Sequence, residues 1–336
     1  YATPPTATPS QPPAALDAAP DGAVINLAEG TYALEAPLTV ARGITLKGAG
    51  RDRTILAATA DFSPAITIDD ADAVVERLTI KDVIRDTTSP SYKPTGVLIT
   101  GNGGTLREAR VWNCYDKHLG NVYGAVKSEG SRGRISRCVI DGNRNVGNGS
   151  ACGGVFLAGG VLENSLITNN SAWATANLRS GGVYAAGWSR VLNCTVMYNT
   201  FIPMGSYATG GSVQVVGGLV RNTIIAGNVI SGKGDANLYG DTNAFAYCLS
   251  PDPFPAGTRG NITAVPQFDA KRPLYLARRS PGVNAGSTGE FPELLAMTDL
   301  FGLPRVKHVT AKGGTMIDIG CTESTYRQAA SMFILR

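Results

Sequence analysis

The sequence predicts an all-β protein folded as a right-handed parallel β-helix, a solenoid in which short strands stack coil upon coil. Three observations lead to this prediction. One phrase, VLNCTVMYN at 191–199, has close copies at 135–143, 162–170 and 220–228. A second phrase, GGVYAAG at 181–187, precedes it and recurs at 96–101, 124–130, 153–160 and 210–218. No segment between them keeps a helical period, so each repeat consists of short strands closed by Gly or Asn.

The two phrases repeat with nearly the same period. Aligned on its cysteine, the first phrase steps by 24, 27, 29 and 29 residues, through Cys114, Cys138, Ser165, Cys194 and Thr223. A period near 28 suits one coil of a β-helix, in which equivalent side chains stack about 4.8 Å apart. We therefore expect these five residues to point the same way in successive coils. Asparagine suits tight corners, so a stacked ladder is expected from Asn143, Asn170, Asn199 and Asn228.

Three regions are expected along the chain. Residues 1–21 form a proline-rich arm and cap, with one helical turn over 14–19 covering the open end of the solenoid. Residues 22–323 form the β-helix. Residues 324–336 form a tail whose apolar end, 332–335, is a capping strand or a docking segment.

Self-assembly through the ends is one interpretation of these terminal segments. An extended proline-rich arm could lie in a groove of a neighbouring copy and build a head-to-tail filament. The alternative is an arm that runs along its own β-helix, and the sequence leaves both open. The residues expected to mediate assembly are Tyr1, Pro4, Pro5, Phe333, Ile334 and Leu335.

Composition excludes several classes of protein. Charged residues make up 17% of the chain, and the net charge of +4 is scattered, so nucleic acid is not an expected partner. No stretch approaches the roughly 20 apolar residues of a transmembrane helix. The chain begins at Tyr1 rather than Met, which we interpret as a secreted or cell-surface protein whose signal peptide has been removed.

The six cysteines fit an oxidising compartment. Cys114 and Cys138 are candidates for a disulfide between successive coils, and a ladder of reduced, buried thiols is the alternative. The chain has no CxxC motif and only two histidines, so no metal site or cofactor is expected.

Two parts of the chain resemble known β-helix proteins. The phrases INL at 25–27, EGTY at 29–32 and GITLKG at 43–48 resemble the first coils of secreted proteins of the pectate-lyase-like superfamily. Towards the other end, ordered phrases resemble the closing region of bacterial surface proteins of the "choice-of-anchor Q" type: NTIIAGN at 222–228, GNITAVPQF at 260–268, SPGVNAG at 280–286, TDLFGLPR at 298–305 and IDIGCTE at 317–323. That family usually has Ala where this chain has Cys321. The resemblance implies an extracellular β-helix and no particular reaction.

Enzymes of this superfamily act on polysaccharides, and this chain carries none of their signature phrases. A lyase needs a base and usually a cation, for which Ca²⁺ would be expected, and a hydrolase needs two carboxylates. The best candidate cluster is Asp116, Lys117 and His118, with Lys81 and Asp82 one coil earlier. It is either a base beside a cation site or a solvated ladder of turn residues.

Aromatic residues also recur after the second strand of each repeat. They could stack on sugar rings or contact a partner, or fold back on their own loops. The candidates are Tyr92, Tyr115, Trp173, Tyr198, Phe201, Tyr207 and Tyr239.

Two functions remain open. The first is a surface β-helix protein with a structural or adhesive role, binding a polysaccharide or its own copies. The second is a secreted lyase or glycoside hydrolase acting on an anionic polysaccharide. The missing catalytic phrases favour the first, and the cluster at 116–118 favours the second.

Overall fold

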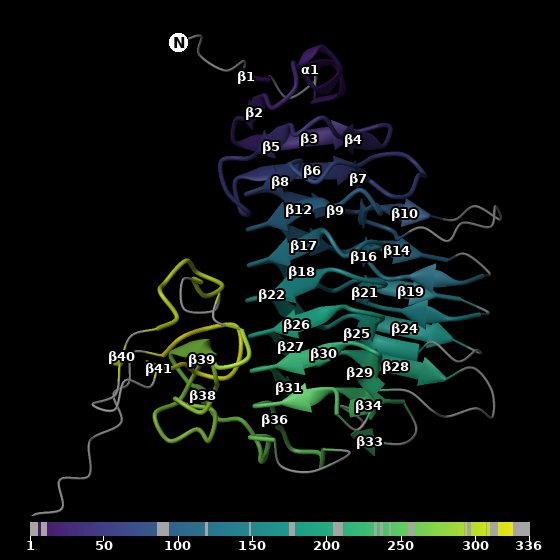
Figure 1. Ribbon diagram of the computed structural model, residues 1–336. Coiled ribbons are helices and arrows are strands. Elements are labelled where there is room, and N and C mark those ends of the chain that lie inside the picture. Colours follow the sequence, from purple (N-terminus) through teal and green to yellow (C-terminus); the bar gives the residue numbers. More distant parts are fainter. Residues whose placement is uncertain are drawn as a thin grey trace, which may run out of the picture.

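The structure is a computed structural model, and it describes residues 6–7, 12–85, 94–117, 120–147, 149–174, 179–203, 211–231, 234–235, 238–241, 243–254, 259–291, 293, 297–306, 308–309 and 315–324. It confirms the predicted parallel β-helix: short strands stack into four long sheets, with one short helix at the first coil (Figure 1). A full coil visits the four sheets, which we name C, A, B and D, in that order.

Each sheet runs along the solenoid and takes its strands from successive coils. Sheet A contains β1 (Thr6–Ala7), β2 (Val24–Leu27), β5 (Thr45–Lys47), β8 (Val74–Glu76), β12 (Gly104–Arg107), β17 (Gly133–Ser136), β22 (Val161–Glu163), β26 (Arg190–Leu192), β30 (Leu219–Arg221) and β35 (Phe245–Ala246). Sheet B contains β3 (Gly30–Leu34), β6 (Thr54–Ala58), β9 (Thr79–Lys81), β13 (Arg110–Trp112), β18 (Val139–Asp141), β23 (Leu166–Thr168), β27 (Thr195–Met197), β31 (Ile224–Ala226), β36 (Leu249–Ser250) and β37 (Ile262–Thr263). Sheet C contains β4 (Leu38–Val40), β7 (Ile66–Ile68), β11 (Val97–Ile99), β15 (Val122–Tyr123), β16 (Val126–Ser128), β20 (Ala151–Cys152), β21 (Val155–Leu157), β25 (Arg179–Ala186), β29 (Gly211–Val216) and β34 (Leu238–Gly240). Sheet D contains β10 (Ile84–Arg85), β14 (Tyr115–Asp116), β19 (Arg144–Val146), β24 (Ser171–Ala174), β28 (Thr200–Pro203), β32 (Val229–Ile230) and β33 (Gly234–Asp235).

The core is one apolar column inside the solenoid. Successive residues of a strand point to opposite faces of its sheet, so the middle residue of each three-residue strand in sheets A and B faces inward. Ile80, Val111 and Ile140 stack in this way in sheet B and are fully buried. The flanking residues of each strand therefore form the outer surface, which is where a ligand could bind.

The corner asparagines form the expected ladder inside the solenoid. The Nδ2 atom of Asn143 donates to Oδ1 of Asn170 at 2.8 Å, and the pattern continues from Asn170 to Asn199 at 2.9 Å and from Asn199 to Asn228 at 3.0 Å. Each of these side chains is buried, so every rung satisfies polar groups that water does not reach.

The predicted alignment of Cys114 with the cysteine position of the later coils is wrong. Arg110 pairs with Val139, which places Ala109, not Cys114, opposite Cys138. Cys114 instead lies opposite Asn143, whose side chain accepts a hydrogen bond from the Cys114 backbone N–H at 3.0 Å. The anomalous first step of 24 residues reflects this displacement. The remaining members stay in register: Cys138, Ser165, Cys194 and Thr223.

The same strand register shows that the candidate disulfide between Cys114 and Cys138 is not formed. The two residues lie at different corners of the coil, and all six cysteines are free and buried. The structure therefore contains reduced thiols. Burial raises their pKa values, to about 12 for Cys114 and about 11 for Cys138.

The first coil is capped by residues of the same chain. Helix α1 (Pro12–Ala18) lies over it, at 12–18 rather than at the expected 14–19, and buries Leu16 in the main core. Strand β1 pairs in parallel with β2, so this part of the arm extends its own sheet A. Tyr1, Pro4 and Pro5 lie outside the described residues, and arm exchange through them stays a prediction.

The parallel β-helix ends at β37, well before the expected boundary at 323. The chain then folds back, and the described part of residues 264–324 lies alongside the later coils (Figure 1). This C-terminal segment contains the hairpin β38 (Phe268–Asp269) with β39 (Arg272–Leu276), and β40 (His308–Val309) with β41 (Thr315–Met316). Phe333, Ile334 and Leu335, expected in the tail, lie outside the described residues.

Apolar contacts hold the C-terminal segment against the outer faces of sheets A and B. Ile317 packs with Val161 and Leu192 of sheet A. Leu300 and Cys321 pack with Leu166 and Met197 of sheet B. Outward-facing residues of these coils are therefore buried, whereas the earlier coils keep polar outer faces.

Buried polar contacts stabilise the part of the C-terminal segment that contains the loop 298–303. Arg305 is fully buried, and its Nη2 atom donates to the backbone carbonyl of Asp318 at 2.7 Å and lies 3.6 Å from the Glu323 carboxylate. The Asp299 carboxylate accepts backbone N–H groups of Phe301, Leu303 and Glu323. The phrases TDLFGLPR and IDIGCTE thus have a structural role: they fix the loop 298–303 against the solenoid.

Candidate functional site: an arginine cleft

Two adjoining pockets open where the loop 298–303 meets the corner between sheets A and B. We call them together the arginine cleft. The first has a volume of about 270 Å³ and is lined by Gly50, Arg51, Arg77, Glu108, Arg137, Leu300, Phe301 and Gly302. The second has a volume of about 370 Å³ and is lined by Thr105, Arg107, Arg134, Ser136, Arg137, Glu163, Asn164, Met297 and Thr298. Five arginines and two glutamates line the cleft, so it has an excess of positive charge.

The corner between sheets A and B places one residue per coil in the left-handed conformation. The pairing of sheet A aligns Arg77, Glu108 and Arg137 on three successive coils, with φ values of 58°, 51° and 51°. The next three coils carry asparagine at the same position, at Asn164, Asn193 and Asn222. Asparagine tolerates this conformation, whereas arginine and glutamate adopt it at a cost of order 1 kcal/mol. Backbone strain of this kind is common at functional sites.

The first pocket contains two arginines that are not neutralised by the described carboxylates. Among the described residues, neither Arg51 nor Arg77 has a carboxylate within ion-pair distance. Arg51 donates to the carbonyls of Arg137 and Leu300 at 3.5 and 3.4 Å, and Arg77 donates to the carbonyl of Ala49 at 3.3 Å. Their guanidinium groups therefore keep donors for an anion that enters the pocket.

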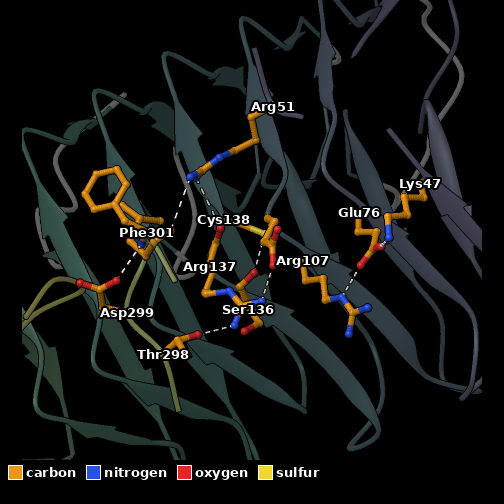
Figure 2. Close-up of polar contacts among 12 residues, drawn as sticks. Lys47, Arg51, Glu76, Arg107, Ser136, Arg137, Cys138, Thr298, Asp299 and Phe301 are labelled. Carbon is orange, nitrogen blue, oxygen red and sulfur yellow. Dashed lines mark hydrogen bonds and ion pairs between the residues drawn. The ribbon is translucent and has the colours of Figure 1, made fainter. Parts of the chain in front are cut away.

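The second pocket contains arginines that are paired but still half-exposed. Glu76 accepts ion pairs from Lys47, at 3.4 Å, and from Arg107 (Figure 2). Arg134 makes a bidentate contact to Glu163 at 2.9 and 2.8 Å. The Arg107 and Arg134 side chains remain 44% and 47% exposed, so part of each guanidinium faces solvent.

One ion pair lies between the two pockets. Arg137 bonds the Glu108 carboxylate and donates from Nη1 to Oγ1 of Thr298 at 2.5 Å, which ties the solenoid corner to the C-terminal segment (Figure 2). Arg137 lines both pockets, whereas Glu108 lines the first. The pair carries no net charge, like the Arg134–Glu163 pair of the second pocket.

An aromatic ring borders the first pocket. Phe301 is 49% exposed and stacks on Tyr275 of β39, with ring centroids 5.7 Å apart and planes 14° apart. In Figure 2 the ring lies beside the Arg51 side chain. An exposed ring fixed from behind, next to these two cations, offers an apolar face and charged donors to the same ligand.

The predicted catalytic cluster does not converge on one groove. Asp116 is fully buried inside the solenoid and pairs with Arg85 at 2.7 Å, whereas the neighbouring Lys117 is exposed and lies 5.4 Å from the Tyr115 ring centroid. Adjacent residues of a strand point to opposite faces, which separates them. His118 lies outside the described residues.

Lys81 and Asp82 belong to another part of the surface, the outer edge of sheet B. The Lys81 ammonium lies 3.0 Å from the Asp82 carboxylate and 5.3 Å from the Trp112 ring centroid. Arg110 also lies over Trp112 and bonds Asp141, which raises the pKa of Arg110 above its usual value. These charges already have partners in the structure, as in the solvated-ladder interpretation.

The predicted aromatic contacts are divided between the surface and the core. Phe201 is fully buried, so its predicted ligand contact is wrong. Tyr115 and Trp173 sandwich the Arg144 guanidinium, with centroids 4.9 and 4.0 Å away. Tyr198 and Tyr239 are exposed, at 57% and 41%. Tyr92 and Tyr207 lie outside the described residues.

The residues that the structure describes contain no group of three or more His, Cys, Asp or Glu side chains placed to hold a metal ion. No helix among them is long and apolar enough to cross a membrane.

Comparison with known proteins reveals similarity to β-helix enzymes at low identity. No protein-family model and no curated protein matches the chain. A pectin methylesterase bound to a hexasaccharide aligns with 69% of this chain and 89% of its own, at 15% identity and a TM-score of 0.37. A second such complex covers 79% and 88%, at 16% identity and 0.36. The A-module of a mannuronan C-5 epimerase from Azotobacter vinelandii covers 74% and 87%, at 15% identity and 0.20. Function does not carry over at these values, so the site must be interpreted from its own residues.

Sequence reasoning missed the arginine cleft, although a signal was present. Arg77, Arg107 and Arg137 recur at intervals of 30 residues, close to the coil period, at the last residue of a sheet A strand or just after it. Arg51 and Phe301 carry no such signal, because the fold-back of the C-terminal segment brings them together.

Proposed function

We propose that this chain is an adhesive surface β-helix protein that binds an anionic polysaccharide in the arginine cleft without cleaving it. The observation that carries the proposal is the pair Arg51 and Arg77, which face one pocket with no carboxylate among the described residues close enough to pair with them, and which lie beside the exposed ring of Phe301. A uronic acid combines a carboxylate with an apolar ring face, which matches this pair of features.

The carboxylates around the cleft support binding over catalysis. Glu76, Glu108 and Glu163 each form an ion pair with an arginine. A hydrolase needs one carboxyl group that donates a proton and a second that attacks or activates water. Carboxylates held by guanidinium groups serve neither role well, whereas they orient the arginines for binding.

The resemblance of the closing phrases to choice-of-anchor Q proteins supports a location at the cell surface. An adhesive protein there needs a ligand site that is rigid and accessible. The cleft meets both needs, because its arginines lie on stacked coils and Phe301 lies on a loop fixed by buried contacts.

The test combines binding with product analysis. Isothermal titration calorimetry is run with polygalacturonate and, as the uncharged control, dextran, and the polymer is then assayed separately for unsaturated ends and for reducing ends. The proposal predicts binding of polygalacturonate that weakens as salt rises, no binding of dextran, and no new ends. Unsaturated or reducing ends above the background of a boiled sample would refute the non-catalytic role. Equal binding of both polymers would refute the role of the arginines.

A further inference from the structure

The two pockets of the cleft differ in how their charges are balanced. Every arginine that lines the second pocket pairs with a carboxylate: Arg107, Arg134 and Arg137. The first pocket also contains Arg51 and Arg77, which have no such partner among the described residues. The acidic group of a ligand is therefore attracted to the first pocket, and the second pocket can recognise an uncharged part of the same ligand.

The second pocket contains an uncharged group with unused hydrogen-bonding capacity, the side-chain amide of Asn164. This residue lines the pocket and is 1% exposed. Its Oδ1 atom is buried and has no hydrogen-bond partner among the described residues. Its Nδ2 atom donates to Sδ of Met297 at 3.4 Å, and a thioether is a weak acceptor. Both ends of the amide would gain from a better partner, because a buried polar group without a good hydrogen bond is destabilising.

We propose that Asn164 is a specificity-determining residue that binds two neighbouring hydroxyl groups of a sugar, so that the cleft selects polyanions that carry hydroxyls. This inference rests on the proposed function. A primary amide has an acceptor oxygen and a donor nitrogen side by side in one plane. Hydroxyls on adjacent ring carbons match it, because one can donate while the other accepts. One sugar hydroxyl then donates to Oδ1 of Asn164, and its neighbour accepts from Nδ2 in place of the Met297 thioether.

The surroundings of Asn164 suit this role. Its φ of 48° is in the left-handed region that asparagine tolerates, so the corner holds the amide on a rigid coil. Met297 is half-buried and unbranched, so its side chain can turn aside for a ligand while the backbone stays in place. Arg137 occupies the same corner one coil earlier and lines both pockets, so one ligand can reach from the first pocket to this amide.

The experiment blocks the hydroxyls of the ligand and removes the amide from the protein. Polygalacturonate and its 2,3-O-acetylated form, which keeps every carboxylate, are cut to matched lengths and titrated calorimetrically at fixed salt. Asn164→Gly removes the amide, and glycine suits the left-handed backbone. Asn193→Gly is the matched control. Asn193 is fully buried at the same corner of the next coil, its amide also has no hydrogen-bond partner among the described residues, and it lines neither pocket.

The unaltered protein should bind polygalacturonate about five- to tenfold more tightly than the acetylated form, because acetylation removes the hydrogen bonds to the amide. Asn164→Gly should weaken polygalacturonate binding by a similar factor and should bind both forms equally. Asn193→Gly should bind both forms as the unaltered protein does. Equal binding of the two forms by the unaltered protein overturns the inference without any variant.

Two results with the variants also overturn it. An effect of acetylation that persists in Asn164→Gly shows that another group senses the hydroxyls. Equal losses of affinity in Asn164→Gly and Asn193→Gly show that the substitutions act through the corner and not through the pocket. All of these results leave the proposed function standing, because polygalacturonate still binds. Absence of polygalacturonate binding to the unaltered protein overturns the proposed function and this inference together.

Discussion

Arg77→Asn should weaken polysaccharide binding while leaving the β-helix about as stable as before. The substitution removes one guanidinium that faces the first pocket. A hydrogen bond to a charged group contributes about 1.5–3 kcal/mol, and the lower end applies at this partly exposed site. We therefore expect affinity for an anionic polysaccharide to fall about tenfold.

The expected effect on stability is small because two changes oppose each other. Asparagine relieves the left-handed backbone at φ 58° by about 1 kcal/mol. The variant loses the bond from Arg77 to the Ala49 carbonyl, at 3.3 Å, which contributes about 0.5–1 kcal/mol. The melting temperature should therefore move by no more than about 2–4 °C.

Calorimetric titration and thermal unfolding followed by circular dichroism measure the two effects. Arg132→Asn is the control, because Arg132 is exposed in the turn between β16 and β17 and its loss changes the net charge equally. Unchanged affinity in Arg77→Asn would refute the role of the pocket. Equal losses in both variants would show that only net charge matters.

The remaining predictions concern the buried thiols and the C-terminal segment. Burial raises the pKa values of Cys114 to about 12 and Cys138 to about 11. The folded protein should therefore resist thiol reagents at pH 8 and react with them only on unfolding. Rapid labelling of the native protein would contradict this prediction. Unfolded thiols release their protons near their ordinary pKa of 9.0, whereas the folded ones keep them. The contribution of the buried thiols to the free energy of unfolding is therefore complete below pH 9.0 and is lost as the pH rises toward about 12. A denaturant midpoint that stays constant over this pH range would be inconsistent with this prediction. Arg305→Leu removes the cation beside the buried Glu323 carboxylate and should destabilise the C-terminal segment by about 3–5 kcal/mol. Residues 264–324 should then become sensitive to protease while the circular dichroism of the solenoid strands is unchanged. An unchanged cleavage pattern would argue against a role of Arg305 in holding this segment.

The repeats made the solenoid predictable, and the same repeats misled the alignment at one cysteine. The asparagine ladder followed directly from the sequence because each rung depends on a residue type and a period. Cys114 resembles the other cysteines in its local phrase, yet it follows the sheet B strand of its coil, whereas Cys138 precedes the equivalent strand. Cys114 therefore belongs to the asparagine position.

The candidate site was harder to predict because it depends on contacts distant in sequence. The Asp116–His118 cluster looked like a site because its charges are adjacent in the chain, but adjacent strand residues face opposite sides. Arg51 and Phe301 are 250 positions apart, and only the fold-back of the C-terminal segment brings them to one pocket. A short period reveals the coils, and it contains no information about what packs against them.

The most direct test of the central claim is a crystal structure of the protein with a bound acidic oligosaccharide. A carboxylate of the ligand should contact Arg51 and Arg77, and a sugar ring should lie over Phe301. A ligand seated instead on the outer face of sheet D, over Tyr115 and Trp173, would contradict it.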